Sequence, residues 1–161
     1  MGLLPQPSNA VVVATPAKDK VFVAGQALGI DESKVRFQKA KESLQFLLQH
    51  YDDVVANGGG DNIRRYLGTV GWSNPMYGIT KVMKELQDEA SDIVEYTENM
   101  NDFDSALRNA DGLAYSANFV EYSAAKTKPE TYFADAKKEV KRMIQYMDTM
   151  GKEINLQETK E

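Results

Sequence analysis

Three consecutive glycines, Gly58 to Gly60, interrupt a chain whose other segments carry long helical periods. Glycine loses the most backbone entropy on folding, so three in a row are costly inside a long helix. Asp61 follows them as a candidate N-cap for a new helix. A second break is predicted at 72–75 (WSNP), because proline disfavours the helical conformation of the residue before it. We therefore expect two long helices to meet at a short, partly helical corner within residues 57–80.

Apolar residues recur at spacings of three and four in four segments of about twenty or more residues. The first two predicted helices run from Asp31 or Ser33 to Ala56, and from near Pro75 to a polar joint at Asn99–Asp102. The third begins at Asn101 or Asp102, and the fourth follows a capping box of Thr127 and Glu130 and ends at Gly151. Long helices with short joints predict an all-α fold, an antiparallel up-down-up-down four-helix bundle.

The first thirty residues differ in composition from the rest and carry no helical period. Prolines interrupt them, and two apolar runs, Val11–Val13 and Val21–Ala24, count against a disordered tail. A hairpin is possible, but two strands alone are only marginally stable. We expect an extended N-terminal arm at 1–30, the helical bundle at 31–156 and a frayed C-terminal tail at 157–161.

Composition excludes several classes of function. The chain of 161 residues has no cysteine, which excludes disulfides and thiol chemistry, and its one histidine, His50, nearly removes His-based metal sites and triads. No apolar run approaches the length that spans a bilayer. The formal net charge of −5 argues against nonspecific nucleic-acid binding. The first residues carry no visible secretory or transit signal, so the chain either never had one or is a mature form.

Two alternative functions stay open on these grounds. A helical bundle can be a small enzyme or carrier with a carboxylate metal site or an interior ligand. The acidic residues from Glu85 to Glu98 are the candidates for such a site, but no histidine follows any of them at the spacing that the site needs. A solvated acidic face is therefore expected there. A generic adaptor is the second alternative.

Charge is unevenly distributed along the sequence. Residues 85–111 are strongly acidic, residues 126–142 are mostly basic, and Arg64 and Arg65 form a basic pair at the corner. Such polarity suits docking onto a charged protein surface, where complementary charges set the orientation.

Three stretches carry a resemblance to a known family: DNIRRYLGTVG at 61–71, PMYGI at 75–79 and KTKPETYFADAKKEV at 126–140. Through them the chain resembles the PsbQ-like extrinsic proteins of photosystem II, closest to the forms of diatoms and other red-lineage algae, over roughly Lys34 to Met150. The resemblance implies a four-helix bundle in the chloroplast thylakoid lumen, peripheral on the lumenal face of the thylakoid membrane. Both the PsbQ-type subunit and the diatom-specific fifth extrinsic protein fit, and the arm is less proline-rich than that of plant PsbQ.

The same resemblance implies a function without catalysis, cofactor, metal, nucleic acid or small-molecule substrate. Such proteins bind photosystem II core subunits and other extrinsic lumenal proteins. They support oxygen evolution by shielding the manganese–calcium cluster and helping to retain calcium and chloride.

Docking residues are predicted at the corner and in the arm. Arg64 and Arg65 lie near an expected helix start, where the helix dipole favours anions, and neighbouring helical positions diverge by about 100°, so at least one must be exposed. Trp72 and Tyr77 belong to the residue types of interface hot spots, although an end plug for the bundle is the commoner role. The hypothetical docking set is Arg64, Arg65, Trp72 and Tyr77, with Val12 and Phe22 in the arm.

Overall fold

The computed structural model describes residues 28–120 and 127–156, and within these ranges the chain is helical without a strand. The elements are α2 (Ile30–Gln49), α3 (Tyr51–Ala56), α4 (Gly59–Tyr66), α5 (Ile79–Glu85), the 3₁₀ helix η1 (Gln87–Glu89), α6 (Ile93–Val120) and α7 (Pro129–Glu153). The predicted all-α class is confirmed for this part of the chain. Residues 1–27 and 157–161, most of the expected arm and the expected tail, lie outside it.

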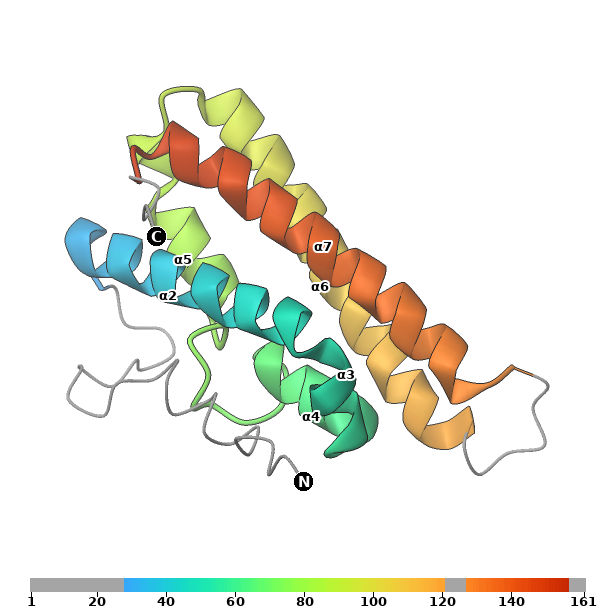
Figure 1. The fold of residues 1–161 in the computed structure, drawn as a ribbon. Coiled ribbons are helices and arrows are strands. Elements are labelled where there is room, and N and C mark those ends of the chain that lie inside the picture. Colours follow the sequence, from blue (N-terminus) through green and yellow to red (C-terminus); the bar gives the residue numbers. More distant parts are fainter. Residues whose placement is uncertain (1–27, 121–126, 157–161) are drawn as a thin grey trace.

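The two longest helices, α6 and α7, lie side by side and run in opposite directions (Figure 1). Helix α2 contacts both α7 and α5, while α4 contacts α6 and α3. None of the described helices is long and apolar enough to cross a membrane.

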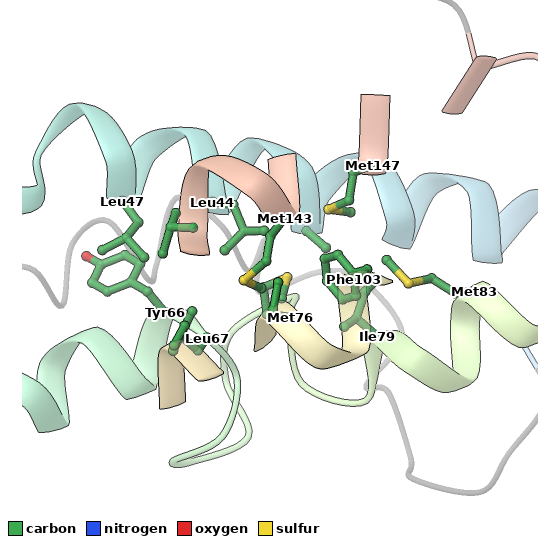
Figure 2. Close-up of a cluster of buried hydrophobic side chains, with 14 of the residues drawn as sticks. Leu44, Leu47, Tyr66, Leu67, Met76, Ile79, Met83, Phe103, Met143 and Met147 are labelled. Carbon is green, nitrogen blue, oxygen red and sulfur yellow. The ribbon is translucent and has the colours of Figure 1, made fainter. Parts of the chain in front are cut away.

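The core lies where the helices meet, and Figure 2 shows its central side chains. The stripe predicted for the first helix is confirmed, because all of its members are buried: Phe37, Ala40, Leu44, Leu47, Tyr51 and Val54. The methionine stripe of α7 is also buried, as expected for core filler: Met143, Met147 and Met150. Periodicity located these positions because they recur at helical spacing.

The boundary between the second and third predicted helices is wrong. Helix α5 ends at Glu85, Ala90 is extended (φ −69°, ψ 134°), and α6 runs without a break through 99–102. The run at 99–102 is not a joint: Asn101 and Asp102 are exposed, Met100 packs against the core, and Asn99 Nδ2 donates to the Glu95 carbonyl within the helix. Ile93 and Val94, assigned to an inward stripe, are exposed.

The predicted ends of α4 and α7 also need correction. Helix α4 begins at Gly59 with Gly58 as its N-cap, so Asp61 lies inside its first turn rather than capping it. Lys128 is the N-cap of α7 and makes no side-chain cap bond, so the capping box of Thr127 and Glu130 is wrong. Both predictions relied on local cap patterns in the sequence.

The C-terminal end of α7 lies two residues beyond the predicted one. Gly151 is helical and buried, and the helix closes in a Schellman motif, with Leu156 N–H donating to the Gly151 carbonyl (2.9 Å) and Asn155 N–H to that of Lys152 (3.2 Å). Asn155 supplies the left-handed residue (φ 56°). A Cβ on Gly151 would lie 3.8 Å from both Phe37 and Leu156, an ordinary van der Waals contact, so the packing of α7 on α2 does not require glycine here.

The predicted corner exists, and α2 holds it in place. Its buried Asn74 accepts from the Met76 N–H (2.8 Å) through Oδ1 and donates to Ser43 Oγ of α2 (2.9 Å). Arg36 of α2 donates to the Asn74 carbonyl (3.1 Å). Pro75 is buried in this corner and not in the first turn of α5, which begins at Ile79. Residues 67–78 therefore form a fixed loop, not a helix.

Candidate functional site

Arg64 lies in the last turn of α4, not at a helix start, so the helix dipole favours its charge. Its Nε donates to Asp111 Oδ1 of α6 (2.8 Å), and its Nη1 lies 3.7 Å from Asp61 Oδ1. The guanidinium carbon lies 5.0 Å from the centre of the Tyr115 ring, within cation–π range. Arg64 therefore fastens α4 to α6, and the dipole argument that made it a docking residue is wrong.

Arg65, in contrast, is exposed and has no ion-pair partner among the described residues. The expectation that at least one of the two adjacent arginines faces solvent is confirmed. A partner protein can therefore reach Arg65 without breaking an ion pair.

Trp72 is 72% exposed, so it does not plug the end of the helices. It follows Thr69 by three residues, which puts their Cα atoms within about 11 Å of each other. Thr69 Oγ1 donates to Asp111 Oδ1, the same oxygen that accepts from Arg64. Asp111 thus ties the loop that carries Trp72 to α6.

Two more aromatic residues, missed in the sequence, are exposed on α6. The rings of Tyr115 and Phe119 lie 4.8 Å apart, and Arg64 lies against the Tyr115 ring. The sequence does carry a signal for this pair: the two aromatic residues are four positions apart, so they share a helix face, and they lie outside the apolar stripe of α6. The exposed side chains of Arg65, Trp72, Tyr115 and Phe119 belong to α4, to the loop after it and to α6, the elements that Asp111 joins, and are together called the α4–α6 surface below.

The backbone of Tyr77 lies in the part of the corner that contacts α2. Tyr77 is half-buried, its carbonyl accepts from Arg36 of α2 (3.4 Å), and its backbone lies against Gly68. It belongs to the attachment of the corner to α2. Val12 and Phe22 lie outside the described residues.

Carboxylates gather where α6 begins and α7 ends. Glu153 Oε2 accepts from the Asp92 N–H (2.7 Å) and from Ser91 Oγ (2.8 Å), and Asp92 Oδ1 accepts from the Glu95 N–H (3.0 Å). A hydrogen bond with Glu153 raises the pKa of Glu95, and the negative charges of Glu153, Asp92 and Glu98 raise it further. Within 28–120 and 127–156, no group of three or more His, Cys, Asp or Glu is arranged to hold a metal ion.

The described part of the chain is thus a helical protein with an exposed arginine and aromatic surface fixed by an internal ion pair. Comparisons with protein-family models, curated proteins and solved structures find no match.

Proposed function

We propose that this chain is a non-catalytic extrinsic subunit of photosystem II, located in the chloroplast thylakoid lumen and peripheral to the membrane. It docks to core subunits and other extrinsic proteins, and so stabilises the manganese–calcium cluster and the retention of calcium and chloride. The resemblance of residues 61–71, 75–79 and 126–140 to PsbQ-like proteins supports this proposal. The first two stretches contain most of α4 and the corner that α2 holds.

We further propose that the helices form an up-down-up-down four-helix bundle. Helices α2 and α3 together are its first member, α4 and α5 its interrupted second, and α6 and α7 its third and fourth. The contacts of α2 with α5 and α7, and those of α4 with α6, support this arrangement (Figure 1).

The observation that carries the docking proposal is the α4–α6 surface. Tryptophan, tyrosine and arginine dominate the binding energy of protein interfaces, and here each is exposed on an element that Asp111 joins to the others. Because Asp111 already fixes α4 and its loop on α6, little additional ordering is needed on binding, and that lowers the entropic cost.

Rebinding to salt-washed photosystem II particles tests the proposal. The double variant Trp72→Ala with Phe119→Ala should lose roughly tenfold or more in affinity, as expected for truncated hot spots. Val35→Ala with Val94→Ala removes two other exposed apolar side chains and should rebind like the wild type. Equal rebinding of the two double variants would move the docking surface elsewhere, whereas a wild-type protein that neither rebinds nor restores oxygen evolution would contradict the function itself.

The single variant Arg65→Glu tests the contribution of charge to this docking. Its rebinding should weaken and become less sensitive to ionic strength, because exposed charges at an interface mainly steer association. Arg64 is left intact because it holds Asp111. A metal analysis and an absorbance spectrum of the purified protein test the alternative of a metal enzyme or carrier.

A further inference from the structure

An open groove of about 640 Å³ lies between α6 and α7. Gly112 of α6 lines it, and a Cβ at this position would meet no atom within 4 Å, so a side chain is missing where the groove has room for one.

Three cations line this groove, Arg108 from α6 and Lys138 and Arg142 from α7. The two helices are antiparallel (Figure 1), and Arg108 and Arg142 are similarly far along the chain from the connection between them. The two guanidinium groups therefore lie at the same end of the groove, and Lys138 lies about one turn from Arg142. Paired guanidinium groups suit carboxylates, which they bind with planar, bidentate geometry.

Each cation has a carboxylate partner on its own helix: Asp104 for Arg108, Asp135 for Lys138 and Glu139 for Arg142. The cations project further into solvent than these partners. Their side chains are 79%, 71% and 59% exposed, against 37%, 47% and 13% for the carboxylates. Exposed pairs within one helix contribute little to stability, so an incoming carboxylate can engage these cations at small cost.

We propose that the α6–α7 groove binds a short acidic segment of a polypeptide. The cations at its rim would receive the carboxylates of the segment, and Asp135 and Glu139, which also line the groove, would accept its backbone N–H groups. These two carboxylates disfavour a polyphosphate or a nucleic acid, whose backbone offers no N–H donors and carries dense negative charge. The site shares no residue with the α4–α6 surface, so it goes beyond the docking proposed above and does not depend on it.

Fluorescence anisotropy of a short fluorescein-labelled peptide of alternating glutamate and alanine, added to the full chain, tests this proposal. The wild type should bind it with an affinity that falls with added salt, and should not bind the counterpart with glutamine in place of glutamate. The triple variant Arg108→Gln, Lys138→Gln and Arg142→Gln should lose roughly tenfold or more in affinity, because it loses the charge-assisted hydrogen bonds. Gly112→Leu should also weaken binding, because its side chain occupies the groove while every charge remains.

The matched control is Lys81→Gln, Lys84→Gln and Lys152→Gln, which removes the same charge from exposed positions outside the groove. This control should bind the peptide like the wild type. Equal loss in both triple variants would show nonspecific attraction and overturn the proposal, as would unchanged binding by Gly112→Leu. Tighter binding of a labelled single-stranded oligonucleotide than of the peptide would assign the rim cations to nucleic acid instead. Absence of peptide binding by the wild type would overturn the proposal outright.

Discussion

At the residue scale, two glycines have opposite structural roles: Gly60 of α4, which faces α6, and Gly112, which lies within α6. A Cβ on Gly60 of α4 would lie 1.9 Å from the Ala114 carbonyl oxygen of α6, so α4 can pack this closely only because that atom is absent. Gly112 is exposed in the middle of α6 and has no such neighbour. The first glycine is needed for packing, while the second contacts no neighbouring helix through a missing Cβ and lowers the helix propensity of α6.

The same substitution should therefore change stability in opposite directions at these two positions. Gly60→Ala should destabilise the fold by about 1–3 kcal/mol or more, because α4 must move away from α6. Gly112→Ala should stabilise it by about 0.5–1 kcal/mol, the propensity difference between alanine and glycine inside a helix. Urea denaturation of both variants measures the two free energies of unfolding, and shifts of the same sign would contradict the α4–α6 packing.

At the element scale, the described helix ends depend more on tertiary partners than on sequence signatures. Residues 85–92 contain no glycine or proline, and local pattern alone predicts that a helix continues through them. The chain breaks there because Glu153 of α7 accepts from Ser91 and Asp92, and because the Tyr96 hydroxyl donates to the Met83 carbonyl of α5 (2.6 Å). These bonds join residues that no local window compares.

Two alanine substitutions should separate a working cap from an apparent one. Asp92→Ala should cost about 1 kcal/mol, because its carboxylate accepts the free Glu95 N–H at the start of α6. Thr127→Ala should change stability by less than about 0.5 kcal/mol, because Thr127 is exposed and outside the cap of α7. Thermal denaturation measures the stability of both variants, and Asp92→Asn, which keeps the capping oxygen, serves as the control. A larger loss of stability from Thr127→Ala than from Asp92→Ala would refute the cap assignment.

At the scale of the whole molecule, the ends of α6 and α7 are joined by carboxylates that interact with one another. The hydrogen bond with Glu153 raises the pKa of Glu95 from its ordinary value of 4.5. The folded state then binds this proton more tightly than the unfolded state does. The contribution to stability is therefore fully present below pH 4.5 and is lost as the pH rises through the raised pKa.

Glu95→Gln should reveal this dependence, because glutamine keeps a hydrogen-bond donor and removes the charge. Relative to the wild type, the variant should gain stability as the pH rises from about 4.5 through the raised pKa of Glu95, because the wild type loses this contribution as Glu95 deprotonates. Asp88→Asn on η1 removes a carboxylate charge outside this cluster and serves as the control. Denaturation midpoints measured across this range test the prediction, and a difference from the wild type that stays constant with pH would argue against the Glu95–Glu153 contact.

Glycine and proline by themselves determined the existence of the corner. Sequence periodicity determined the helical class, the buried stripe from Phe37 to Val54 and the methionine stripe of α7. Each depends on residues close together in the chain, whose side chains share a helix face by geometry alone. Within the docking set, the exposure of at least one arginine followed from the same geometry. The α6–α7 groove was not predicted, because its lining residues come from two helices.

Only the tertiary structure decided that Arg64 holds Asp111, that Trp72 is exposed, and that Glu153 of α7 accepts bonds at the start of α6. The partners in the two ion-pair and cap contacts are separated by 47 and 61 residues. Polar side chains of this kind can pair with many others, and a single sequence does not select among them. The selection is made when the apolar stripes pack, because packing fixes which polar groups remain within hydrogen-bonding distance of one another.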